Sequence, residues 1–270
     1  MNGSMINAMV SMNGLQQKLD ILADNIANVN TVGYKRKDAS FQDLLTNMKV
    51  QSDEFKEPGR LSPMNYTQGW GSRLMAIQPD LTQGTLKATD NGLDIAIEGD
   101  ALYQVQTPEG SAFTRNGAFQ LSLQTDGRAL LATSDGYPVM SENDQPIVIP
   151  ANRTIRVTTD GTVQAIAQDD TVTTIGKLKL LQVTRPTMLT TVADNLYAVA
   201  EGVNVEDVLR TVTAGEGSDI AVRQGFLEQS NVDLTSEMTE LINVQRAYQL
   251  SARALTSSDT MMGLANSLRA

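Results

Sequence analysis

The residues with the clearest chemical potential are carboxylates in the middle of the chain. They are Asp94, Glu98, Asp100, Asp126, Asp135, Asp144 and Asp160. A suitably spaced pair could serve as acid and nucleophile in glycoside hydrolysis. Three of them, Asp126, Asp135 and Asp160, directly precede glycine, and Asp-Gly is a dipeptide that tight hairpin turns require. A role in turns therefore explains them sufficiently, and a secreted carbohydrate-binding or hydrolytic β protein is the more distant alternative.

Other kinds of site have less support in the sequence. The 270 residues include no cysteine and no histidine, which removes disulfides, thiolate ligands, the cysteine nucleophile and the commonest general base and zinc ligand. The spacing of calcium-binding loops is absent. Gly215 and Gly217 are not followed by the Gly-Lys-Ser/Thr ending of a phosphate loop. We expect no catalytic residue, no cofactor and no metal, and hence no enzyme.

Charge and hydropathy narrow the possible partners. The net charge is −10 and is uneven, since residues 1–45 are neutral and residues 226–270 carry −2. An acidic middle does not favour nucleic acid, because phosphate binding requires clusters of lysine and arginine. No apolar run approaches the roughly 20 residues that span a bilayer, and the first residues lack the pattern of a secretory signal. We expect neither membrane insertion nor a cleaved signal peptide.

The first part of the chain has the periodicity of a helix with one apolar stripe. Its apolar residues lie three and four apart: Met5, Ala8, Met12, Leu15, Leu19, Leu22, Ile26 and Val29. This spacing is typical of a helix that packs lengthwise against another helix. Turn formers follow, so the helix should end near Val29 and the chain should reverse there. Phe41, Leu44, Leu45 and Met48 indicate a short amphipathic continuation.

The last part of the chain repeats the pattern. Gaps of three, four or seven separate Leu234, Met238, Leu241, Val244, Tyr248, Leu255, Met262 and Ala265. Ser230, Asn231 and Asp233 precede this run and can cap the start of a helix. We predict that the two helices pair in a coiled-coil-like domain. The predicted assembly interface consists of Met12, Leu15, Leu19, Leu22, Ile26, Val29, Leu234, Met238, Leu241, Val244, Tyr248, Leu255 and Met262.

Between the two ends the period changes to two. Short alternating runs such as LDIAI (93–97) and LYQVQ (102–106) are separated by Asp, Asn, Gly and Pro, which favours an antiparallel β domain. The predicted fold class is therefore α+β. Its expected parts are a terminal helical assembly domain (1–45 and 226–270), an extended linker or loop (46–74) and a central all-β domain (75–225). Within the linker, Trp70 fits an anchor that holds the loop onto its own domain, and residues 202–234 should lead out through another loop.

Four long stretches resemble the flagellar rod and hook proteins of bacteria, most closely those of the distal rod type. Residues 19–45, LDILADNIANVNTVGYKRKDASFQDLL, are similar to the N-terminal rod signature of that family. NGLDIAIEGDALYQV (91–105) and AFTRNGAFQLSLQTDGRALLATSDGYPV (112–139) resemble its core β motifs. Residues 225–269 resemble its C-terminal signature. Arg185-Pro186 departs from the usual Asn-Pro pair, and residues 46–75 match least.

The resemblance implies a structural subunit that self-assembles helically into a hollow drive shaft. In such a shaft the terminal helices line an axial tube, with the β domain outside them. The implied partners are further copies of the chain, other rod and hook subunits, and the flagellar type III export apparatus. The implied location is the basal body of the flagellum, reached without a cleaved signal. A hook or hook-like subunit is the alternative within the same family.

Overall fold

The computed structural model describes most of the chain and divides it into two compact units. The described residues are 2–43, 47–49, 66–68, 72–123, 128–150, 153–193, 195–200, 202–215 and 219–268. One unit, here called the helical unit, comprises Met1–Ile26, Lys37–Ile77 and Leu234–Ala270. The other, the β unit, comprises Ala27–Arg36 and Gln78–Asp233. The mixture of terminal helices and antiparallel sheets confirms the α+β class.

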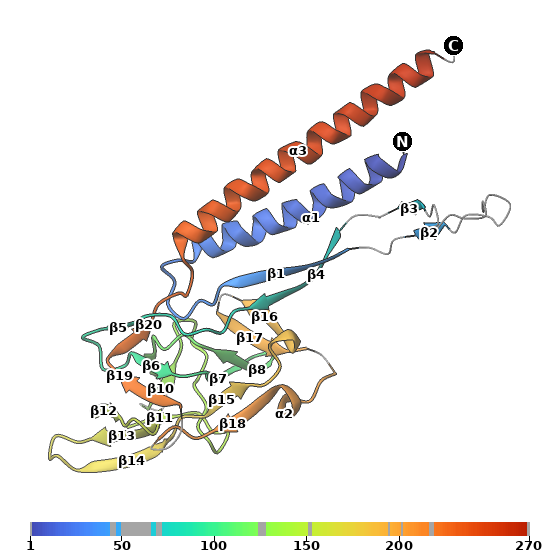
Figure 1. Cartoon of the computed structure of the whole chain (residues 1–270). Helices are drawn as coiled ribbons and strands as arrows, with labels where there is room; N and C mark the ends of the chain where they lie inside the picture. Colours follow the sequence, from blue (N-terminus) through green and yellow to red (C-terminus); the bar gives the residue numbers. More distant parts are fainter. Residues whose placement is uncertain are drawn as a thin grey trace. The chain divides into compact units, whose positions relative to one another are not determined.

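The helical unit contains the two long helices, α1 (Asn2–Ala27) and α3 (Leu234–Ser267), alongside each other in Figure 1. They have 26 and 34 residues, so at 1.5 Å per residue they extend about 39 and 51 Å. The predicted helix boundaries hold, because α1 ends within two residues of Val29 and α3 begins directly after Asp233. A turn follows α1, where the Thr31 amide donates to the Asn28 carbonyl at 3.1 Å.

The predicted amphipathic continuation after α1 is wrong. Residues 37–43 form strand β1 (Lys37–Asp43), which pairs with β4 (Ser72–Pro79). Pairing supplies backbone hydrogen bonds that a helix of this length would have to make within itself, and short isolated helices are marginal. Two further strands, β2 (Asn47–Lys49) and β3 (Tyr66–Gln68), pair antiparallel inside the range expected to be a linker. Leu44, Leu45 and Trp70 lie outside the described residues.

The β unit is built from antiparallel strands joined by tight turns. Its largest sheet has the order β16-β17-β8-β7-β15-β18. These strands are β7 (Leu102–Thr107), β8 (Gly110–Thr114), β15 (Leu180–Val183), β16 (Leu189–Ala193), β17 (Leu196–Val199) and β18 (Leu209–Val212). A 3-10 turn (Pro186–Met188) precedes β16, and the short helix α2 (Val205–Val208) precedes β18.

Smaller sheets complete the β unit. Two have three strands, in the orders β11-β10-β9 and β12-β13-β14, and two are pairs, β19-β6 and β20-β5. Their strands are β5 (Leu86–Ala88), β6 (Ile95–Glu98), β9 (Gln120–Leu123), β10 (Ala129–Ala132), β11 (Val148–Ile149), β12 (Thr154–Val157), β13 (Thr162–Ile166), β14 (Val172–Lys177), β19 (Ala221–Gln224) and β20 (Phe226–Glu228). The loop expected over 202–234 is therefore wrong. That stretch contributes three strands, because β18, β19 and β20 each complete a ladder begun by an earlier strand.

Alternating side chains of these strands fill two cores. The larger contains Ile95, Tyr103, Val105, Leu131 and Val163, none of which is measurably exposed. Tyr103 meets Phe119 edge to face, with ring centroids 5.1 Å apart. The Asp-Gly turns form as predicted where they are described: Gly136 and Gly161 adopt φ of 86° and 82°, values that favour glycine. The period-two pattern is thus explained by burial of one face of each strand.

Candidate assembly surface

On α1 the predicted interface residues are buried to different degrees. Leu22 is buried, and Met12, Leu15, Leu19 and Ile26 are partly exposed. Val29 is also partly exposed but lies two residues beyond the end of α1. Two neighbours that the prediction omitted, Ile21 and Asn25, are buried as well. The inward side of α1 is therefore broader than one stripe and includes a polar residue.

On α3 the predicted residues also divide. Val244 is buried, and Leu241, Tyr248, Leu255 and Met262 are partly exposed. The other two, Leu234 and Met238, are each 44% exposed. The first two predicted positions thus lie on a more open face of the helix than those that follow.

The less exposed stripe of α3 contains polar residues that the apolar pattern could not reveal. It runs through Glu237, Leu241, Val244, Tyr248, Ser251, Leu255, Ser258 and Met262 at strictly alternating gaps of four and three. Glu237 and Ser258 are buried at 3% and 7% exposure. A sustained average gap of 3.5 residues is the period of a coiled-coil seam. Continuing the 3-4 spacing through polar positions would have found these residues in the sequence.

Polar side chains connect the two helices. Lys18 Nζ forms an ion pair with Glu240, and Asn25 Nδ2 donates to Glu237 Oε2 at 3.2 Å. Asn25 also holds β1, since its amide donates to the Lys37 carbonyl at 3.0 Å and accepts from the Lys37 amide at 2.9 Å. Asn25 therefore connects α1 with both α3 and β1, a role that sequence reasoning missed.

A cavity of about 410 Å³ opens within the helical unit. Two predicted interface residues, Leu15 and Val244, reach it together. Its other lining residues are Ser11, Gly14, Lys18, Phe41, Glu240, Asn243 and Ala247. Residues from the apolar stripes of both helices therefore line one cavity, and their side chains do not fill it.

Large apolar side chains also remain exposed on both helices and, at Leu268, directly after α3. They are Ile6, Met9, Leu234, Met238, Ile242, Leu250, Met261, Leu264 and Leu268. Exposure reaches 63% at Leu250, 65% at Leu264 and 88% at Leu268. Clustered exposed apolar side chains mark surfaces that contact other proteins. Each helix therefore presents apolar surface on more than one side.

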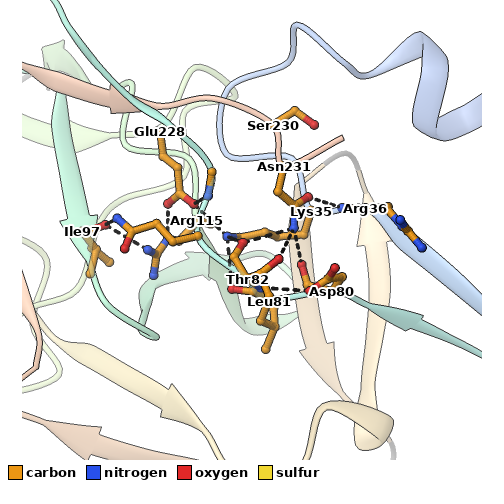
Figure 2. Close-up of polar contacts among 12 residues, drawn as sticks. Lys35, Arg36, Asp80, Leu81, Thr82, Ile97, Arg115, Glu228, Ser230 and Asn231 are labelled. Atoms are coloured by element: carbon orange, nitrogen blue, oxygen red, sulfur yellow. Dashed lines mark hydrogen bonds and ion pairs between the residues drawn. The ribbon is translucent and has the colours of Figure 1, made fainter. Parts of the chain in front are cut away.

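In the β unit, a buried ionic cluster holds together segments that are distant in sequence (Figure 2). Glu228 Oε1 accepts from Lys35 Nζ at 2.7 Å and from the Gly84 amide at 2.8 Å. Its other oxygen accepts from Arg115 Nε. Lys35 and Glu228 each have side chains no more than 2% exposed. No spacing signal in the sequence linked Lys35 to a glutamate 193 residues away.

The remaining donors of this cluster are satisfied by backbone carbonyls. Lys35 Nζ also donates to Thr82 at 2.7 Å and to Leu81 at 3.3 Å, and Arg115 donates to Ile97 at 2.9 Å and to Ala101. Burial lowers the pKa of Lys35, an effect that nearby Glu228 opposes and Arg115 reinforces. Saturated hydrogen bonding is what makes buried charges tolerable.

Asn231 makes a second connection beside this cluster. Its Oδ1 accepts from the Arg36 amide at 2.8 Å, and its Nδ2 donates to the Asp80 carbonyl at 2.8 Å and to the Thr82 carbonyl at 3.1 Å. The Asp80 amide in turn donates to the Arg36 carbonyl at 2.7 Å. The sequence suggested Asn231 as a helix cap, whereas in the structure its side-chain amide joins two other chain segments.

We call the set formed by residues 33–36, 80–84 and 228–231 the three-segment junction. The Gly33 amide adds a bond to the Glu228 carbonyl at 2.8 Å. Gly33 has φ of 69°, and a Cβ there would lie 2.6 Å from the Asn116 amide nitrogen. Glycine is thus required at this position both by backbone conformation and by space.

Four of the central carboxylates form hydrogen bonds or ion pairs within the β unit. Asp94 accepts from Asn91 at 3.0 Å, Glu98 pairs with Arg223 at 2.7 Å, and Asp144 pairs with Lys179 at 2.5 Å. Asp160 accepts from Thr158 and Thr162, which lowers the pKa of its carboxyl group. Asp126 lies outside the described residues. In the part of the chain that the structure describes, no three acidic side chains gather as metal ligands would.

These features define a class of protein: a chain with a complete β core whose terminal helices carry apolar surface that the single chain leaves uncovered. Three family profiles match it. They are "Flagella basal body rod protein" over 5–35, "Flagellar hook protein FlgE/F/G D1 domain" over 96–165, and "Flagellar basal body rod FlgEFG protein C-terminal" over 223–268. The chain belongs to the flagellar basal-body rod family.

Relatives of this family match almost end to end. The chain is 34% identical to the flagellar hook-basal body complex protein FlhP of Bacillus subtilis, covering 98% of this chain and 99% of that protein. It is 32% identical to the rod protein FlgG of Borreliella burgdorferi (96% and 95% covered) and 35% identical to FlgG of Agrobacterium fabrum (95% of each). Among the described residues, neither long helix is apolar enough to cross a bilayer. The family resemblance inferred from the sequence is confirmed.

Proposed function

We propose that this protein is a structural subunit of the flagellar basal-body rod, of the distal rod type. Copies of it assemble helically into a hollow shaft that transmits torque to hook and filament and lets exported subunits pass. The observation that carries the proposal is the uncovered apolar surface of α1 and α3, in a chain that matches named rod proteins nearly end to end. The protein acts mechanically and is not an enzyme.

In this proposal residues 1–45 and 226–270 form the assembly domain, and residues 75–225 form the outer β domain, with 46–74 between them. The helices pair as a coiled coil within a subunit through the 3-4 stripe of α3, and their outer faces contact neighbouring subunits. Such heterologous contacts generate an open helical tube. The 13 predicted interface residues are its contact positions, supported by the cavity that Leu15 and Val244 share.

The proposed partners are further copies of this chain, other rod and hook subunits, and the flagellar type III export apparatus. The protein reaches the basal body without a cleaved signal peptide. It contacts no nucleic acid and does not insert in the membrane. Family membership supports the rod and hook partners.

Disulfide scanning tests the helix pairing. The chain has no native cysteine, so an introduced pair reports without background. One cysteine is placed at Leu19, Leu22 or Ile26, and the second is scanned along Leu241, Val244, Tyr248 and Leu255. Disulfides require α-carbons about 4.4 to 6.8 Å apart, so we expect strong cross-links at periodic positions in assembled shafts. Mass separates links within a subunit from links between subunits.

A control pair at Val163 and Gly176, which face each other in the β13–β14 ladder, reports on oxidation itself. If the control links and no helix pair does, the two helices are not packed together and the proposed tube loses its support.

A hook-like subunit is the second candidate, because one matching profile is named for a hook protein and one relative for the hook-basal body complex. Imaging a fluorescently tagged chain along isolated hook-basal bodies separates the two. Rod density below the hook supports the first proposal, and labelling along the hook supports the second.

A further inference from the structure

The chain passes between the helical unit and the β unit at four points: 26/27, 36/37, 77/78 and 233/234. Three of these points lie within three residues of the three-segment junction, at Arg36, Asp80 and Asn231. Figure 2 shows their polar groups converging with Lys35 and Glu228 inside the β unit. Three of the segments that connect the β unit to the helical unit are therefore hydrogen bonded to one another inside the β unit.

We propose that the three-segment junction is a mechanical clasp, which holds these three exits together so that torsion reaching the β unit is shared among them. The proposal rests on the rod function proposed above. The clasp requires no other molecule, because each of the three segments is held by the other two. Without it, load on one exit would act on that segment alone.

The pattern of bonds supports a clasp because every pair of segments is joined directly. Arg36 meets Asp80 through backbone atoms at 2.7 Å, and Gly33 meets Glu228 at 2.8 Å. The 80–84 segment meets 228–231 through the Gly84 amide and through Thr82, whose Oγ1 accepts from Asn231 at 3.0 Å. Losing one contact leaves each segment attached to another.

Burial makes the clasp suited to sustained load. Lys35 and Glu228 in the junction, and Arg115 beside them, have side chains at most 2% exposed, so water cannot readily replace their bonds. The exposed ion pair between Lys18 and Glu240, with 27% and 49% side-chain exposure, lacks this protection. A junction that only assisted folding would affect stability without affecting motility under load, and this difference can be measured.

The test compares two side-chain amides that bridge segments of the same unit. Asn231→Ala removes the bridge at the exits. Gln224→Ala is the matched control: its amide accepts from the Val157 amide at 3.0 Å and donates to Gly92 at 2.6 Å and Ile155 at 2.9 Å, away from the junction. Each variant is produced as the full chain and also introduced into cells lacking the native protein. Hydrogen exchange, thermal unfolding and swimming in dilute and viscous medium are measured.

We expect Asn231→Ala to speed exchange of the Arg36 amide about tenfold, the factor that one lost hydrogen bond is worth. It should swim normally in dilute medium and fail as viscosity rises. Gln224→Ala should lower the unfolding temperature to a similar extent and swim normally in both media. Equal swimming of the two variants at high viscosity, or unchanged exchange at Arg36, overturns the clasp.

If Asn231→Ala does not fold, Thr82→Val decides instead, because it removes one side-chain bond while keeping the shape of the residue. It should show a smaller defect under load, and normal swimming at high viscosity overturns the proposal. The unaltered chain, introduced into the same cells, separates the two proposals. If it does not restore motility, the result counts against the rod function. If it restores motility and the variants behave alike, only the clasp is overturned.

Discussion

The β unit and the helical unit treat their apolar residues differently. In the β unit Ile95, Val105 and Leu131 are essentially inaccessible, whereas on α3 Leu250 and Leu264 are 63% and 65% exposed. Burial of apolar surface contributes about 25 cal/mol per Å². The β unit therefore gains its stability within one chain, and the helical unit can gain much of its own only when other surfaces cover it.

One ion pair from each unit shows a similar contrast in burial. Lys35 and Glu228 are buried and fully hydrogen bonded, whereas Lys18 and Glu240 meet at the surface. Breaking a buried pair leaves an uncompensated charge, while a surface pair contributes little. The buried pair of Lys35 and Glu228 thus stabilises the β unit. The exposed pair of Lys18 and Glu240 contributes little stability and serves mainly to orient the two helices.

The largest expected effect separates assembly from folding. Leu255→Asp on α3 should abolish assembly and motility, because a carboxylate buried in a helical seam costs several kcal/mol. The β unit should stay folded, as measured by unchanged near-UV circular dichroism of the monomer. Leu123→Asp in the β unit is the control, since Leu123 is 78% exposed and should tolerate the change. Normal swimming of the Leu255→Asp strain at normal protein levels would remove α3 from the assembly surface.

The second prediction compares the two ion pairs. Glu228→Gln keeps the shape of the side chain but leaves Lys35 and Arg115 without a counter-charge, so the free energy of unfolding should fall by about 3 to 5 kcal/mol. Glu240→Gln should change it by less than about 1 kcal/mol. Denaturant unfolding of the purified chains measures both. Similar losses in the two variants would show that burial does not distinguish the pairs.

A third, smaller difference concerns glycine. Gly33→Ala should destabilise the β unit by about 1 to 3 kcal/mol, because φ is 69° and the new Cβ would lie 2.6 Å from the Asn116 nitrogen. Gly263→Ala on α3 meets nothing within 4 Å and should stabilise the helix by up to about 1 kcal/mol. Thermal unfolding of both variants checks the opposite signs, and a stabilising Gly33→Ala would contradict the account of the junction.

The smallest effect is a pH dependence confined to the β unit. Hydrogen bonds from Thr158 and Thr162 lower the pKa of Asp160 below its usual 3.8. The stability they confer is therefore present above about pH 4 and lost as pH falls through the lowered pKa of the folded state. Asp160→Asn, which suits the same turn, should lose less stability than the unaltered chain between pH 5 and pH 2. The check is the unfolding temperature of both proteins measured across this pH range. If it falls equally in both, Asp160 makes no such contribution.

Much of the fold follows from local pattern. The 3-4 spacing from Met5 to Val29 and from Leu241 to Met262 sufficed to place both helices, and alternation between turn-forming residues sufficed for strands β6 and β7. The strands β1, β4 and β18 to β20 escaped prediction. Each of them pairs with a strand from another part of the chain, and that pairing cannot be read from the local sequence.

The sequence by itself determined which residues recur at helical or strand spacing, where turns interrupt them, and the resemblance to the flagellar rod family. Those properties depend on neighbours within a few positions. Only the tertiary structure decided that Lys35, Arg115 and Glu228 meet in one buried cluster, that Asn231 joins three chain segments, and that Glu237 and Ser258 lie on the less exposed stripe of α3. The contacts of Asn231 join residues up to 195 positions apart. The sequence around a residue does not indicate a partner at that distance, because burial and hydrogen bonding depend on which residues the complete fold places next to each other.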